Sequence, residues 1–165
     1  MHRVRHAVLA SLAIVAIGAA AAVAGNAHFI KSATSVQLSG SSLQFNFKEA
    51  GLQSGSVETV TGSAFATTTY ECVNGGGRNP SASNKTTTRS AVSKSGQFTA
   101  DRNGNIGGSL TLSPPTAAQL GFNCPPGQTV TFVGVGYSGA QLADATAVAS
   151  ISLPGTFSYT NPSAP

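Results

Sequence analysis

The chain has 165 residues, of which 41% are hydrophobic and 8% are charged, and its net charge is +4 at pH 7. This length fits one domain, and the scarcity of charged residues argues against helix bundles and coiled coils, which need Leu, Glu, Lys and Ala at helical spacing. The few Lys and Arg residues are scattered singly among Ser, Thr and Gly, so no nucleic-acid-binding face is expected.

The first 27 residues are predicted to be a secretory signal peptide. Two arginines are followed by residues 7–24, which are small or apolar apart from one serine and become rich in Ala and Gly. This order is typical of a signal peptide, whereas a membrane anchor is longer and more strongly apolar. Cleavage after Ala24 or after Ala27 fits the small-x-small rule equally well. We therefore expect a secreted protein that does not contact the membrane after cleavage.

The first predicted strands form a hairpin at residues 35–38 and 43–47. Leu43, Phe45 and Phe47 alternate with polar residues, which indicates a strand with one buried face. A glycine between the two runs favours a hairpin turn.

Residues 57–73 are predicted to be one long strand whose even positions face the core, from Val60 to Cys72. The odd positions are mostly Thr and Ser. Glu58 and Glu71 are assigned to the outward face, where water would solvate their carboxylates.

Residues 74–85 are the longest predicted loop, and residues 86–92 are a short polar strand at a sheet edge. The runs 97–100 and 106–112 predict a hairpin around the turn 101–105. The oxygen-rich side chains of this turn also suggest a calcium loop, although the carboxylates and terminal Glu typical of such loops are missing.

The last third of the chain predicts one helical turn and three strands. The helical turn covers residues 116–120, and the most apolar strand covers residues 129–137. Two closing strands, 143–153 and 155–159, are separated by Pro154.

This pattern of about eight strands leaves no room for βαβ crossovers. It predicts one antiparallel β-sandwich of immunoglobulin-like type over residues 28–160, with a small closed barrel as the alternative. Residues 161–165 are expected to be a disordered tail, and the domain is expected to be a monomer.

The only two cysteines, Cys72 and Cys124, are predicted to form a disulfide. An exported chain meets an oxidising compartment, and an even count of two permits one pairing. A metal site would need more ligands than these cysteines and one histidine supply.

The residues offer little for catalysis. The mature chain has at most one histidine, His28, and five acidic residues, and it lacks the G-x-S-x-G, P-loop, G-x-G-x-x-G and H-E-x-x-H motifs. We therefore expect a protein that is not an enzyme and has no cofactor, with an unrecognised hydrolase as the alternative.

The expected function is binding of an extracellular or cell-surface ligand. The candidate contact residues lie in the glycine-rich loop and are Asn74, Arg78, Asn79 and Lys85. Loops on a rigid scaffold often carry binding residues. Flat aromatic stacking of a sugar is not expected, because Tyr70 and Tyr137 are assigned to the core.

An alternative function is copper binding through His28. If cleavage follows Ala27, the α-amino group and the imidazole of His28 could chelate Cu(II) through two nitrogens. Asp101 or Asp144 would then have to complete the site.

Three segments, AHFIKSAT at residues 27–34, FKEAGL at 47–52 and CVNGGG at 72–77, resemble a group of small exported actinobacterial proteins described as hypothetical secreted proteins. The resemblance implies export and a small size. The chain is also distantly similar in architecture to the enediyne-binding apoproteins of the neocarzinostatin kind. Those proteins carry two disulfides where this chain can form one, and the similarity implies ligand carriage only by analogy.

Overall fold

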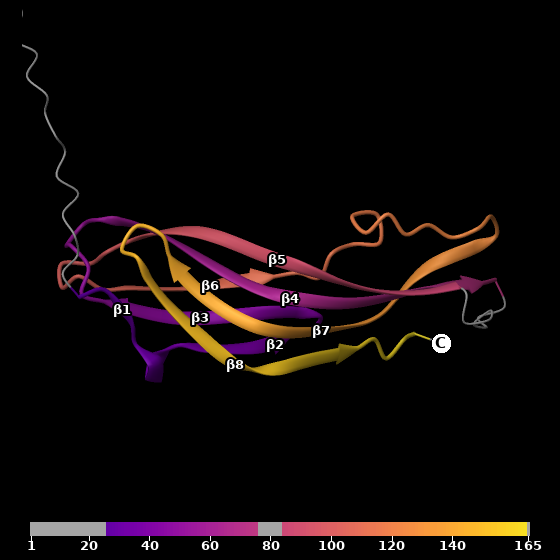
Figure 1. Ribbon diagram of the computed structural model, residues 1–165, viewed down its shortest axis with the longest axis horizontal. Helices are drawn as coiled ribbons and strands as arrows, with labels where there is room; N and C mark the ends of the chain where they lie inside the picture. Colours follow the sequence, from indigo (N-terminus) through magenta and orange to yellow (C-terminus); the bar gives the residue numbers. More distant parts are fainter. Residues whose placement is uncertain (1–25, 76–83, 165) are drawn as a thin grey trace, which may run out of the picture.

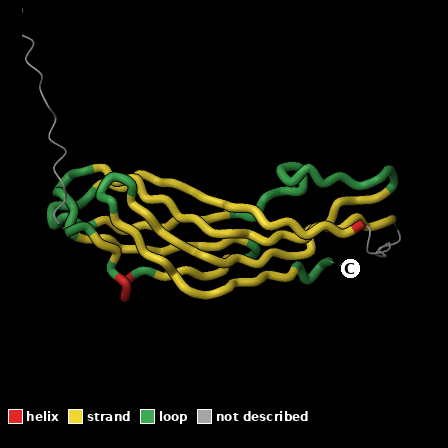
Figure 2. Tube along the Cα trace, viewed as in Figure 1, coloured by secondary structure: helices red, strands yellow, loops and turns green. Residues whose placement is uncertain are grey.

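The computed structural model describes residues 26–75 and 84–164, and these fold into two antiparallel four-stranded sheets (Figures 1 and 2). The first sheet contains β1 (His28–Phe29), β2 (Ser35–Ser39), β3 (Ser42–Ala50) and β6 (Ile106–Leu112). The second has the order β5-β4-β7-β8 and contains β4 (Val57–Asn74), β5 (Lys85–Thr99), β7 (Gln128–Asp144) and β8 (Ala149–Thr160). A short 3₁₀ turn, η1 (Lys31–Ala33), follows β1.

This architecture confirms the predicted β-sandwich, and the sheets do not close into a barrel. In the first sheet β3 pairs with β1 and β2 on one side and with β6 on the other. In the second sheet β4 pairs with β7. These pairings between strands far apart in sequence are those of an immunoglobulin-like Greek key. No helix in the described part of the chain is long and apolar enough to cross a membrane.

The core forms where the alternating residues of β3 meet those of β4 and β7. Leu43 and Phe45 are completely buried, as are Val60 and Leu142 in the opposite sheet. Tyr137 of β7 crosses the core, and its hydroxyl donates a hydrogen bond to the Ser41 carbonyl at 2.9 Å. The predicted hairpin and the inward even positions of β4 are thereby confirmed.

The second sheet is much longer than the first. The Tyr137 hydroxyl reaches the carbonyls of Ser41 and Leu112, which mark one end of the first sheet. Beyond this level the second sheet continues alone, as Figure 1 shows for β4, β5 and β7. We call this part the overhang; it consists of residues 67–74, 85–89, 128–136 and 158–160.

The predicted hairpin of residues 97–100 and 106–112 is wrong, because the turn between these runs changes sheets. The first run belongs to β5, which pairs with β4, whereas β6 pairs with β3. The ring of Phe98 lies edge-on to that of Phe47 at 5.0 Å and occupies the space over Gly108, which fixes this crossing. β5 is also one continuous edge strand and includes the run predicted as 86–92.

The predicted closing strands also differ from the structure. Residues 143 and 144 end β7, and the next strand, β8, runs straight through Pro154. Because β8 is an edge strand, the missing N–H of Pro154 need not cost a ladder hydrogen bond. Asn161, the first residue of the expected tail, donates its backbone N–H to the Val133 carbonyl at 2.8 Å.

Candidate functional site

The connection 113–127, between β6 and β7, is attached to the inner face of the overhang. The predicted disulfide is present and joins Cys124 of the connection to Cys72 of β4, with a Cα–Cα distance of 5.5 Å. The hydroxyl of Tyr70, also on β4, donates a hydrogen bond to the Pro115 carbonyl at 3.0 Å. A long segment without strand structure is therefore held at two points on a rigid sheet.

The connection also has internal order. The backbone N–H of Thr116 donates to Gln119 Oε1 at 2.8 Å, and the N–H of Gln119 lies 3.3 Å from the Thr116 hydroxyl oxygen. This reciprocal arrangement is a capping box. The N–H of Leu120 donates to the Thr116 carbonyl, so residues 116–120 close a single hydrogen-bonded turn that is not continued as a helix.

A cleft of about 530 Å³ separates the connection from β5. Its lining mixes apolar side chains with hydroxyl and amide groups, and Lys94 is the only ionisable residue among them. The lining residues are 90–94 of β5, 111–116 at the end of β6 and the start of the connection, and Gln119 and Leu120. Such a lining can bind an uncharged or singly anionic ligand with both apolar and hydrogen-bonding groups.

On the other side of the connection, four aromatic rings form a row across the overhang. Tyr70 lies 6.4 Å from Phe122 of the connection and 5.5 Å from Phe132 of β7, and Phe132 stacks on Tyr159 of β8 at 6.2 Å. The amino-acid pattern did not predict this row. A bulge places an extra residue, Val133, in β7, so Phe132 lies opposite Tyr70 on the inner face.

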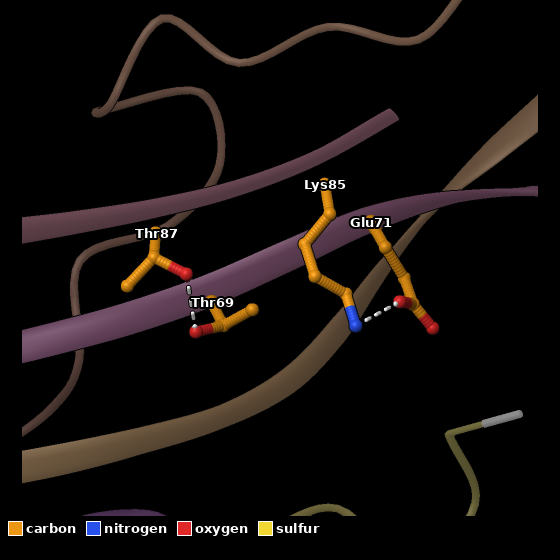
Figure 3. A network of polar contacts seen from close by, with 4 residues as sticks. All are labelled: Thr69, Glu71, Lys85 and Thr87. Atoms are coloured by element: carbon orange, nitrogen blue, oxygen red, sulfur yellow. Dashed lines mark hydrogen bonds and ion pairs between the residues drawn. The ribbon is translucent and has the colours of Figure 1, made fainter. Parts of the chain in front are cut away.

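Two of the predicted loop residues, Asn74 and Lys85, lie at the tip of the overhang, apart from the cleft lining. Asn74 ends β4, while Arg78 and Asn79 lie outside the described residues. Lys85 begins β5 and forms an ion pair with Glu71 at 3.1 Å, next to the hydrogen-bonded hydroxyls of Thr69 and Thr87 (Figure 3). The structure therefore assigns Lys85 to a cross-strand pair.

The expected outward position of Glu58 is wrong, and so is the expected solvation of both Glu58 and Glu71. Glu58 occupies an even position of β4 and faces inward, with 2% of its surface exposed. Glu71 is on the outward face, but its side chain is only 4% exposed because the cross-strand partner Lys85 lies against it.

Three carboxyl groups gather at the other end of the sandwich. Glu49 of β3 is completely buried, and Glu58 and Asp144 are nearly so. Burial and the negative charges of Asp144 and Glu58 raise the pKa of Glu49 to about 7. The Ser56 hydroxyl donates to Glu58, and Asp144 accepts from the N–H of Thr146 at 2.7 Å.

The residues considered for metal binding have other contacts. His28 is exposed in β1, and its Nδ1 lies 2.7 Å from the Asn26 carbonyl oxygen. Asp101 accepts hydrogen bonds from the N–H groups of Asn103 and Asn105, which lower the pKa of its carboxyl group and close the predicted turn. Within residues 26–75 and 84–164, no group of three or more His, Cys, Asp or Glu side chains is placed to hold a metal ion.

Comparison with known proteins adds no assignment, since no protein-family model, curated protein or solved structure matches the chain.

Proposed function

We propose that this chain is a secreted, non-enzymatic protein that binds an extracellular ligand in the cleft beside β5. The observation that carries the proposal is the attachment of the connection 113–127 by the disulfide and by the Tyr70 hydroxyl. The cleft volume lies in the range typical of ligand sites. A preformed wall on a rigid scaffold also lowers the entropy lost on binding.

The contacts of the acidic side chains support a role other than catalysis. All five acids have structural surroundings: Glu71 is paired with a lysine, Asp101 closes a turn, and the other three lie together in the sandwich interior. None of them lines the cleft. A hydrolase acting there would lack a carboxylate to orient a base or to protonate a leaving group.

Secretion is supported by the disulfide together with the amino-terminal sequence. Disulfides persist mainly in oxidising compartments. A basic start followed by an apolar, Ala-rich run is what an export signal requires.

The proposal is tested by NMR titration of the oxidised domain, residues 28–165, with a panel of short peptides, oligosaccharides and amphiphiles. We expect shifts to gather at the amides of Ser90, Leu112 and Gln119. Ser90→Trp, which fills the cleft, should abolish them, whereas Thr99→Trp, on the same strand but outside the cleft, should not. Shifts that gather on Phe132 and Tyr159 instead, or no shifts with the whole panel, would refute the proposed site.

A further inference from the structure

We infer that the occupant of the cleft is an extended, acidic peptide segment of another protein, which adds to the free edge of β5 as a fifth strand of the second sheet. This inference rests on the proposed function, because it uses the same cleft. It names the class of partner and the backbone atoms that would bind it.

The edge of β5 is available along the cleft. In the part of the chain that the structure describes, β5 is hydrogen-bonded to β4 alone. Near its end Phe98 packs against Gly108, so β6 covers the strand there. Along residues 90–94 the edge instead borders the cleft. An edge strand leaves alternate N–H and C=O groups unpaired, and an extended peptide can pair with them.

The opposite wall of the cleft suits the side chains of such a strand. Pro114 and Pro115 have no N–H, so they cannot donate to the carbonyl groups of β5, which stay open to a partner's N–H groups. Leu120, which is partly exposed, provides an apolar surface beside them. Because successive side chains of a strand point to opposite faces, alternate residues of the added segment would contact this surface.

The charges of β5 favour an acidic partner. The strand carries Lys85, Arg89 and Lys94 and no acidic residue. Lys85 is paired with Glu71, and Arg89 lies 4.0 Å over the ring of Phe65, whereas Lys94 lies in the cleft lining, which contains no carboxylate. An opposite charge across a strand pair stabilises it, and a like charge destabilises it.

The same charges argue against a second copy of this chain as the occupant. Pairing two β5 edges would bring the cations of both copies together, which disfavours association. The other edge of the sheet, β8, carries no charged residue, and Pro154 interrupts its donors. The two edges of this sheet therefore differ in the partners that they can accept.

The test is selection of short random peptides displayed on phage against the oxidised domain, followed by measurements on synthetic copies. We expect the selected peptides to be rich in β-branched residues and to carry Asp or Glu. Their binding should slow hydrogen exchange of amides within residues 90–94. N-methylation of alternate peptide amides should abolish binding, because it removes the donors that pair with β5.

A charge-reversal pair provides the matched control. Lys94→Glu should weaken binding about tenfold, whereas Lys48→Glu, an equal charge change at an exposed position of β3, should leave the affinity nearly unchanged. Equal effects of the two variants, selection of non-acidic peptides, or no slowing of exchange in β5 would overturn the inference.

Two further outcomes separate this inference from the proposed function. If small ligands shift the cleft amides but no selected peptide does, the binding function stands and the peptide inference fails. If neither binds, both fail. Slowed exchange in β5 that depends on the protein's own concentration would identify a second copy as the occupant and refute the inference.

Discussion

The carboxyl group of Glu49 is completely buried, and no donor group reaches its oxygens when it is ionised, whereas the protonated form can donate a hydrogen bond to Asp144. Its pKa is raised from 4.5 to about 7 by burial and by the charges of Asp144 and Glu58. The folded protein therefore binds this proton more tightly than the unfolded chain does. Its contribution to the free energy of unfolding is greatest below pH 4.5 and is lost as the pH rises to about 7.

Glu49→Gln should remove this pH dependence, because the amide stays neutral and can donate to unpaired oxygens of Asp144 and Glu58. We expect the variant to match the wild type near pH 4.5 and to be more stable by about 2 kcal/mol at pH 8. Urea unfolding across this pH range measures the difference. Glu71→Gln is the control, since it breaks the pair with Lys85 and should bring no such gain. Parallel stability curves for wild type and Glu49→Gln would contradict the expectation.

Among the larger elements, the connection 113–127 depends most on a single bond. The disulfide joins residues separated by 52 positions in sequence. In the loop-entropy estimate such a crosslink stabilises the fold by about 4 kcal/mol. The Tyr70 hydroxyl also joins the connection to β4 by donating a hydrogen bond to the Pro115 carbonyl, which contributes about 1 kcal/mol.

Reduction of the disulfide should lower Tm by about 10 °C or more. Calorimetry of the oxidised and reduced domain measures the change. The double variant Cys72→Ala, Cys124→Ala should melt near the reduced protein and should not respond to reductant. An unchanged Tm with both thiols shown to be free would mean that the connection is held by its other contacts.

The sequence predicts an element well where the pattern of residues within that one strand is sufficient. In β3, strict alternation of apolar and polar residues is enough, and the pairing of the only two cysteines follows from their number. Prediction from sequence fails where packing against another strand determines which sheet a segment joins. Residues 97–112 look like a hairpin locally, yet the packing of Phe98 on Phe47 and Gly108 sends the chain to the other sheet.

The candidate site could not be predicted for the same reason. The cleft is lined by residues from β5, β6 and the connection, which are brought together only by tertiary packing. The aromatic row depends on the extra residue in β7, and without this bulge Phe132 would lie on the face opposite to Tyr70. A sequence pattern carries no signal for a bulge that the partner strand imposes.

The whole molecule combines a sandwich with two layers and an overhang with one. In the sandwich, Val60 and Leu142 are completely buried between the sheets. In the overhang, the first sheet is absent from the inner face, and the connection 113–127 contacts that face through Cys72 and Tyr70. Both parts contain the long strands β4 and β7. The first sheet packs on these strands in the sandwich, and the connection 113–127 packs on β4 in the overhang.

Hydrogen exchange should therefore divide these continuous strands into two regions. We expect amides of residues 58–66 and 140–144 to exchange through global unfolding, and those of residues 67–73 and 129–134 through a smaller opening. Reduction of the disulfide should accelerate exchange in the second group more than in the first, because the connection is attached to β4 within the overhang, at Cys72 and Tyr70. Exchange measured by NMR on the oxidised and reduced domain under stabilising conditions separates the groups. Equal acceleration in both would show that sandwich and overhang unfold as one cooperative unit, with the strands transmitting the loss of the connection along their full length.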